Sequence, residues 1–286
     1  MNTTIIGLGE VGRAYAKALH AAGHTLQLCN ARAGVAAQAC ADALCLPLHL
    51  VPGEWLRTSD AVLLCVTGSA APQVVAHCTP WMAPGTTLCD MTTASPDAKR
   101  AAAEVLRQQG VQYLDVAIMG AVALGGHTTP LLVAGDGAGA FKHWMEAAGG
   151  RVSALPAGTA GDAMALKLLR STFTKGLEAL SVELLMAAER QGLREALYTQ
   201  LQDIDDTPLR TFLDMLVRTH VLHAKRRSAE VQEVTTELAR QGLESVVLPG
   251  VAQRFAKTVA ALDAHPLDPA DITTEQALQW LLQQEG

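Results

Sequence analysis

A glycine motif near the start of the chain has the spacing that holds the phosphates of a dinucleotide. The β-branched run Thr3-Thr4-Ile5-Ile6 leads directly into Gly7-Leu8-Gly9-Glu10-Val11-Gly12, and a helical pattern follows from Arg13 to Leu19. In such a turn the first glycine permits the sharp bend, the second lets a pyrophosphate approach the backbone, and the third lets the helix pack on the strand. The helix N-terminus presents free N–H groups to the phosphates. Residues 7–12 therefore predict a dinucleotide site.

The end of the second predicted strand indicates which dinucleotide binds. An acidic residue about 20 positions after the glycines would bond the ribose 2′-hydroxyl of NAD. The stretch here reads Leu28-Cys29-Asn30-Ala31-Arg32 and contains no carboxylate. Asn30 and Arg32 favour a 2′-phosphate, so we expect NADP as the cofactor, with NAD as the alternative. Both residues could instead be ordinary turn and surface residues.

These residues need a sheet to position them, and the first half of the chain predicts one. Apolar β-rich runs alternate with helical patterns, which is typical of a Rossmann-type, mostly parallel sheet covered on both faces. Ser95 and Pro96 mark one helix start, as N-cap and first-turn residue. The predicted strands are 3–7, 25–30, 61–66, 86–90, 112–116 and 131–134, and the predicted helices are 11–22, 33–44, 70–79, 96–109 and 139–148.

The second half predicts only helices. The turn cluster from Leu155 to Gly161 ends the alternation, and a long interdomain helix is expected from about Gly161 to Gln191. The fold class is therefore α/β followed by an all-α domain. We expect an NADP-binding domain at 1–157 and a substrate and dimerisation domain at 158–286. The further predicted helices are 193–202, 208–221, 223–241, 247–262 and 274–283.

Composition argues against several classes of function. Residues 1–157 carry 9 basic against 10 acidic side chains, and residues 158–286 carry 13 against 18, so neither half is a basic nucleic-acid module. All six cysteines lie in the first 90 residues without a C-x-x-C pair, and we expect them to be buried in a reducing compartment. No signal-peptide pattern and no membrane-length apolar run is present. We therefore expect a cytoplasmic protein without nucleic-acid or membrane partners.

Four separated segments resemble the β-hydroxyacid dehydrogenase family, which includes 3-hydroxyisobutyrate dehydrogenase and 6-phosphogluconate dehydrogenase. Residues 7–12 resemble its GLGxMG, and Asp90 to Pro96 resemble its D-x-S-T-x-x-P segment near the nicotinamide. Residues 115–121 and 161–171 stand where the family has D-A-P-V-S-G-G and G-x-G-x-x-x-K-x-x-N-N. The resemblance implies a hydroxy-acid dehydrogenase that needs no metal. Further cofactor contacts are expected at Cys65, Val66, Thr67 and Thr93.

The last segment places Lys167 at the position of the family's catalytic lysine. Oxidising a secondary alcohol needs a group that takes the hydroxyl proton while hydride leaves for the nicotinamide, and a partly desolvated lysine can be tuned toward neutral pH for this work. The neighbours from Ala163 to Leu169 are nearly all apolar, so a charge among them is expected to face a specific partner. The alternative is a solvated lysine with its stem on apolar surface.

Departures from the family fall on the substrate side. Met119 replaces a serine that helps to bind the substrate carboxylate, Gly120 is kept, and Ala121 replaces a glycine. A thioether donates no hydrogen bond, so we expect an apolar pocket in which the backbone of Gly120 and Ala121 binds the carboxylate, unless Met119 only fills space. Ser171 stands in place of an asparagine, on the helix face of Lys167. It is expected to act in catalysis by bonding the substrate or orienting Lys167, or instead to bond back to the carbonyl at position 167. Arg170 is a further expected substrate contact.

A short basic patch lies in the acidic second half, at His220, His223, Lys225, Arg226 and Arg227. Either arginine could anchor a substrate carboxylate or phosphate, although a solvated helix start paired with Glu230 and Glu233 is the preferred interpretation. The two histidines lack an evident third ligand, so we expect no metal site.

Together these features predict an NADP-preferring oxidoreductase that moves hydride between a small hydroxy acid, or related alcohol, and its carbonyl form, with Lys167 as general acid/base. A 3-hydroxyacid would give a β-keto acid that can lose CO2. One alternative is an imine reductase on the same fold, whose members generally replace the lysine. The other is a non-catalytic NADP(H)-binding sensor. We expect a homodimer, because long interdomain helices often pair and the family's members are dimers or tetramers.

Overall fold

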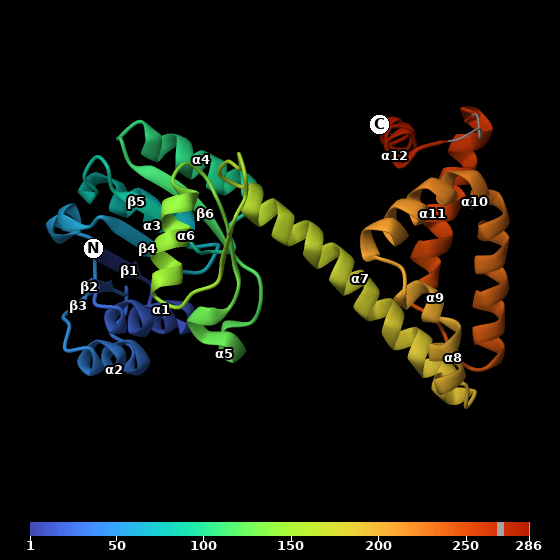
Figure 1. The fold of residues 1–286 in the computed structure, drawn as a ribbon, viewed down its shortest axis with the longest axis horizontal. Helices are drawn as coiled ribbons and strands as arrows, with labels where there is room; N and C mark the ends of the chain where they lie inside the picture. Colours follow the sequence, from blue (N-terminus) through green and yellow to red (C-terminus); the bar gives the residue numbers. More distant parts are fainter. Residues whose placement is uncertain (268–271, 286) are drawn as a thin grey trace. The chain divides into compact units, whose positions relative to one another are not determined.

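The computed structural model describes residues 1–267 and 272–285. These residues group into two compact units, Met1–Thr172 and Phe173–Gly286 (Figure 1). The boundary between these units lies inside a long helix. The division into an NADP-binding domain at 1–157 and a substrate and dimerisation domain at 158–286 stays a prediction.

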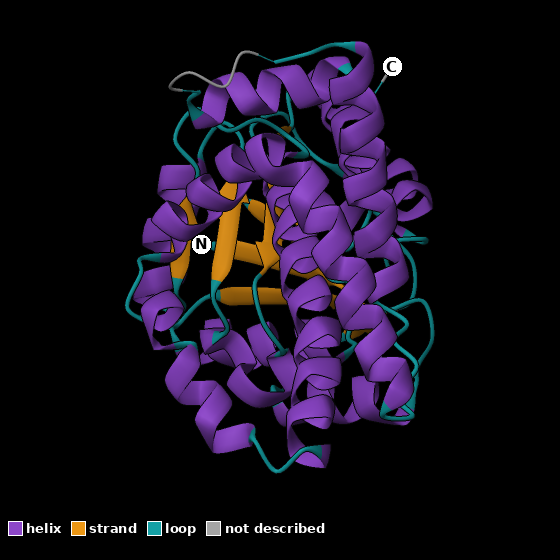
Figure 2. Cartoon of the chain, turned by 90° about the vertical axis from the view of Figure 1, so that its right-hand side faces the viewer, coloured by secondary structure: helices purple, strands orange, loops and turns teal. Residues whose placement is uncertain are grey.

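The first unit is built on one eight-stranded sheet in the order β3-β2-β1-β4-β5-β6-β7-β8. Neighbouring strands are parallel except β6 and β7, which pair antiparallel. The order from β3 to β6 is that of a Rossmann fold, as predicted. All strands among the described residues belong to this unit, and Figure 2 distinguishes them from the helices. Their bounds are β1 Asn2–Ile6, β2 Thr25–Cys29, β3 Leu48–His49, β4 Ala61–Leu64, β5 Thr87–Asp90, β6 Gln112–Ile118, β7 Leu131–Ala134 and β8 Val152–Ala154.

Helices cover both faces of this sheet, so its strands are apolar on both sides. Successive residues of a strand point to opposite faces. On one face Ile5 and Leu63 pack against α1 (Glu10–Ala21), α2 (Val35–Ala43) and α6 (Ala138–Ala147). On the other face Ile6 and Val62 pack against α3 (Ala71–Cys78) and α4 (Pro96–Arg107). Figure 1 shows α1 and α4 on opposite sides of the strands.

Helix α4 begins as the sequence predicts. The Ser95 side chain accepts a hydrogen bond from the Ala98 N–H, and Pro96 occupies the first turn. The predicted strands and helices of this unit are confirmed, with ends that move by a few residues. The strands β3 and β8, which are two and three residues long, and the single turn of α5 (Val122–Gly125) were not predicted from the sequence.

Helices are the only regular secondary structure among the described residues of the second unit. Helix α7 (Asp162–Arg190) begins in the first unit and continues into the second. Val221 of α10 packs against Ala277 and Trp280 of α12 in a buried apolar cluster. The remaining bounds are α8 Arg194–Gln200, α9 Gln202–Asp205, α10 Leu209–Arg240, α11 Leu248–Ala264 and α12 Thr274–Gln283.

Two predictions require correction. The helices predicted at 208–221 and 223–241 are one continuous helix, α10, because no glycine or proline interrupts residues 209–240. Four of the six cysteines are buried as expected, but Cys65 is only partly buried and Cys45 is exposed. Cys45 has a positive φ of 54° and follows Leu44, the C-cap residue of α2, a position where helices often end in a left-handed residue. Among the described residues no helix is long and apolar enough to cross a membrane.

Candidate active site

The predicted cofactor residues follow strands that end at one edge of the sheet. Strands β2, β1, β4, β5 and β6 are mutually parallel neighbours, so their carboxyl ends lie side by side. Ligands of open α/β sheets bind outside this edge. The loops that begin there contain residues 7–12, Asn30 and Arg32, Cys65–Thr67, Thr93 and Met119–Ala121.

The glycine loop has the shape that a dinucleotide requires. Gly7 has a φ of +93°, and a Cβ on it would lie 2.7 Å from the carbonyl oxygen of Cys65. A Cβ on Gly12 would lie 1.9 Å from the carbonyl oxygen of Gly7. Gly9 is different, because a Cβ there would meet no atom within 4 Å. Gly7 and Gly12 are therefore required by the protein's own packing, and the open space at Gly9 fits an approaching pyrophosphate. Leu8 points into the core and Glu10 is exposed.

Asn30 braces this loop. Its Oδ1 accepts a hydrogen bond from the Leu8 N–H at 2.8 Å, and its Nδ2 donates to the Arg32 carbonyl oxygen at 2.7 Å. Both ends of the amide thus have partners inside the protein, while Arg32 is exposed. Arg13, which the sequence analysis did not select, donates from Nη1 to the Leu8 carbonyl oxygen at 2.8 Å.

The loops after β4 and β5 touch each other. A Cβ on Gly68 would lie 2.6 Å from the carbonyl carbon of Thr93, so only glycine permits this approach. The contact brings Thr93, which is exposed, beside the segment that follows β4. In that segment Cys65 and Val66 are partly buried and Thr67 is exposed. The four expected cofactor contacts are therefore close in space.

A buried lysine, which was not predicted as a functional residue from the sequence, lies next to the carboxyl end of β5. Lys99 on α4 is fully buried. Its Nζ donates to the Asp90 carbonyl oxygen at 2.9 Å and lies 3.4 Å from Asp90 Oδ1 and 2.9 Å from Asp115 Oδ1. Asp90 and Asp115 are register partners on β5 and β6, so both carboxylates point to the same face of the sheet. One ammonium therefore separates two buried carboxylates that would otherwise repel each other.

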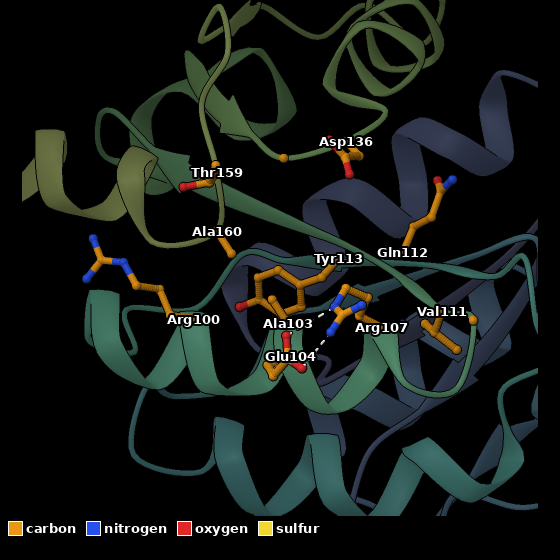
Figure 3. A pocket seen from close by; sticks show the side chains of 12 residues that line it. Arg100, Ala103, Glu104, Arg107, Val111, Gln112, Tyr113, Asp136, Thr159 and Ala160 are labelled. Carbon is orange, nitrogen blue, oxygen red and sulfur yellow. Dashed lines mark hydrogen bonds and ion pairs between the residues drawn. The ribbon is translucent and has the colours of Figure 1, made fainter.

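Tyr113 closes this cluster on its outer side. Its hydroxyl donates to Asp90 Oδ2 at 2.6 Å, and burial and the Asp90 carboxylate raise its pKa, so the phenol stays protonated. The ring lines a surface groove of about 590 Å³ between α4 and the segment that holds Thr159 and Ala160 (Figure 3). The Thr92 N–H donates to Asp90 Oδ1 at 2.8 Å. These contacts satisfy the Asp90 carboxylate without solvent.

The same cluster holds the helix that carries Lys167. Asp115 Oδ2 accepts a hydrogen bond from the Met164 N–H at 2.9 Å, in the first turn of α7, where backbone N–H groups lack helical partners. Gly161, with a φ of +92°, allows the chain to pass the Pro96 carbonyl oxygen. Lys167 follows one turn after Met164 and is half-buried. Burial and the Lys99 ammonium lower the pKa of Lys167, and the Asp115 carboxylate opposes this shift.

The expected substrate residues occupy two places in the first unit. Met119 packs on a cluster of Ala117, Ala134 and Ala163, which favours the interpretation that it fills space. Its N–H donates to the Pro130 carbonyl oxygen at 2.8 Å. The exposed residues Gly120 and Ala121 precede α5, and the exposed residues Arg170 and Ser171 lie one turn beyond Lys167 on α7.

The basic patch of the second unit has internal partners. Arg226 forms an ion pair with Glu230, as the preferred interpretation predicts, but the patch lies inside α10 and not at a helix start. His220 Nε2 lies 2.8 Å from Thr258 Oγ1. No group of three or more histidine, cysteine or acidic side chains with the geometry of a metal site occurs in the described part of the chain.

Comparison with known sequence families gives two matches. Residues 2–152 match the family described as the NAD binding domain of 6-phosphogluconate dehydrogenase. Residues 188–258 match a domain family of unknown function. One curated relative, an uncharacterised 28.5 kDa protein of Methanothermus fervidus, is 29% identical over 98 residues, which are 33% of this chain and 38% of the relative. The match thus spans well under half the length of that relative.

Solved structures similar to this chain cover nearly all of it. A conserved hypothetical protein from Sinorhizobium meliloti is 25% identical, with a TM-score of 0.63 over 99% of this chain and 96% of that one. A conserved protein of unknown function, described as structurally similar to 3-hydroxyacid dehydrogenases, is 26% identical, with a TM-score of 0.64 over 92% and 98% of the two chains. An imine reductase from Myxococcus stipitatus is 18% identical, with a TM-score of 0.76 over 98% and 99%, and shows the fold alone.

The open space at Gly9 yields a test of the cofactor site. We expect Gly9→Ala to fold normally but to bind NADPH roughly tenfold more weakly or worse, a loss of about 1.4 kcal/mol or more, because the methyl group fills the pyrophosphate's place. Gly139→Ala on α6, where a Cβ also meets nothing within 4 Å, is the matched control. Calorimetric titration with NADPH measures both variants. Equal affinities for the two would place the pyrophosphate elsewhere.

Proposed function

Because the chain belongs to the family defined by the NAD binding domain of 6-phosphogluconate dehydrogenase, a family of NAD(P)-dependent oxidoreductases, we propose that it transfers hydride between a small hydroxy acid, or related alcohol, and its carbonyl form. Lys167 is the general acid/base. The observation that supports this role is the placement of Lys167, half-buried and one turn after the Met164 N–H that Asp115 holds. The glycine loop belongs to the same compact unit.

The proposed chemistry divides between cofactor and protein. Bound NADP(H) supplies or accepts the hydride. In the oxidising direction the neutral amine of Lys167 takes the proton from the substrate hydroxyl, and in the reducing direction its ammonium returns a proton to the carbonyl oxygen. A lowered pKa of Lys167 makes the neutral amine available nearer to neutral pH than on an exposed lysine.

We assign the cofactor contacts as follows. Backbone N–H groups of the loop Gly7-Leu8-Gly9-Glu10-Val11-Gly12 hold the pyrophosphate at the start of α1. Exposed Arg32 binds the 2′-phosphate of NADP, and Asn30 acts through its hydrogen bonds to Leu8 and Arg32. Cys65, Val66, Thr67 and Thr93 line the nicotinamide half of the site.

We assign the substrate contacts to the edge beyond β6 and to α7. The backbone of Gly120 and Ala121 binds the substrate carboxylate, and Met119 makes the neighbouring wall apolar. Arg170 supplies a cation for an acidic substrate, and Ser171 orients the substrate on the same helix face as Lys167. A homodimer is the expected assembly.

Removing the Lys167 amine tests the central assignment. In a screen of hydroxy acids and sugar acids with NADP+ and NAD+, we expect wild-type turnover of at least one substrate. Lys167→Ala is expected to keep NADPH affinity but lose about 100-fold or more in kcat. Lys175→Ala, in an exposed ion pair with Glu178 on the same helix, is the control. Equal kcat for Lys167→Ala and wild type would remove Lys167 from the mechanism, and turnover of cyclic imines alone would favour an imine reductase.

The pH dependence of oxidation follows from the lowered pKa of Lys167. The neutral amine is the active form for taking a proton, so the rate of oxidation is expected to rise with pH. Its midpoint should lie below the ordinary lysine value of about 10.4. A steady-state pH profile of kcat/KM measures it, and a midpoint at or above that value would contradict the assignment.

Arg32 provides the test of cofactor preference. We expect Arg32→Ser to lower kcat/KM for NADP+ by about tenfold or more, because hydrogen bonds to charged groups contribute about 1.5–3 kcal/mol. The value for NAD+ should stay nearly unchanged. The ratio of the two specificity constants measures the effect, and a wild type that uses NAD+ alone would overturn the NADP assignment.

Exposed apolar side chains on α7 support a homodimer. Leu177, Leu180, Val182 and Met186 are each at least 41% exposed, which is unusual for one helix of a monomer. We expect sedimentation equilibrium to give twice the 30.1 kDa chain mass. Leu180→Glu should shift the mass toward one chain, whereas Leu124→Glu, at a position 91% exposed in the first unit, should not. A wild-type monomer at micromolar concentration would contradict the dimer.

A further inference from the structure

The two oxygens of the Asp115 carboxylate have different partners. Oδ1 lies 2.9 Å from the Lys99 ammonium, in an ion pair rather than a directed hydrogen bond. Oδ2 accepts the Met164 N–H at 2.9 Å. One buried carboxylate thus joins α4, β6 and the first turn of α7, and Lys167 lies one turn further along that helix.

We infer that Lys99 and Asp115 form a positioning pair for Lys167: Asp115 fixes the helix turn from which Lys167 projects, and Lys99 fixes Asp115 and balances its charge. The inference rests on the proposed function, because it assigns the pair a role toward the proposed general acid/base. Neither residue is exposed, so neither is expected to touch substrate.

The charged groups around Asp115 affect the protonation of Lys167. Asp90 and Asp115 are two buried negative charges, and Lys99 is one positive charge within ion-pair distance of both. Both kinds of charge act on Lys167: Lys99 on α4 repels its ammonium, and Asp115 on β6 attracts it. On its own helix the neighbouring charged groups are Asp162 and Arg170, and Arg100 of α4 pairs with Asp162 at 3.6 Å. Asp115 contacts both Lys99 and the first turn of α7.

Two variants that each remove one charge separate this role from a merely structural one. Asp115→Asn removes the negative charge while its amide oxygen can still accept the Met164 N–H, so the protonation midpoint of Lys167 should fall. Lys99→Met removes the repelling charge, so the midpoint should rise. A purely structural contact would not move the two midpoints in opposite directions. Each shift is expected to be about half a pH unit or more, the scale of a neighbouring charge in a partly buried site.

The measurement is the rate at which acetic anhydride acetylates Lys167 as a function of pH, followed by mass spectrometry of the full-length protein's peptides. Exposed Lys175 on the same helix serves as internal reference in every sample. Because Lys99→Met leaves two buried carboxylates and can fail to fold, the double variant Lys99→Met/Asp115→Asn is compared with Asp115→Asn alone. This comparison isolates the Lys99 charge.

The positional part of the inference has its own readout. Asp115→Ala removes both the charge and the acceptor of the Met164 N–H, so its kcat should fall about tenfold further than that of Asp115→Asn. Lys167 midpoints that stay unmoved, or that move in one direction in both charge variants, would overturn the inference. Opposite shifts accompanied by full turnover of Lys167→Ala would support the coupling and overturn only the proposed catalytic role.

Discussion

A single buried ammonium is the constraint on which the carboxyl edge of this sheet depends. Two carboxylates, Asp90 and Asp115, occupy adjacent register positions on β5 and β6, and water does not reach them. Without Lys99 between them, their repulsion and desolvation would be uncompensated, and breaking such a buried pair costs about 3–5 kcal/mol. Lys99 therefore fixes α4 against both strands, and through Asp115 it fixes the start of α7.

Much of the fold follows from local sequence. The glycine spacing of residues 7–12 requires a strand before it and a helix after it, and β1 and α1 stand there. Fully buried strands such as β4 are recognisable because their residues are apolar on both faces. Ser95 and Pro96 act within one turn of their own helix. In each case the residues that determine the element lie inside it, so a single sequence suffices.

Features that depend on distant partners were harder to predict. β3 is two residues long and exists only because β2 pairs with it. The sequence predicts Asn30 as a cofactor contact but does not indicate its hydrogen bond with Leu8, 22 residues away. Lys99 stands among Asp97 and Arg100, which suggests a solvated helix. The spacing along α4 could have indicated that Lys99 is buried, because it lies four residues before Ala103 and seven before Leu106, on the helix face that packs on the core.

The cofactor loop and Lys167 belong to one compact unit, Met1–Thr172. Their mutual placement therefore depends on contacts within that unit, above all on the bond between Asp115 and the Met164 N–H. The rest of α7 and the helices that follow are then free to vary without moving Lys167 relative to the glycine loop. Residues 7–12 and Lys167 match the family's motifs, whereas Met119 and Ser171, which lie in the same unit, depart from them. Hydride and proton transfer require fixed geometry, whereas a different substrate requires different side chains around it.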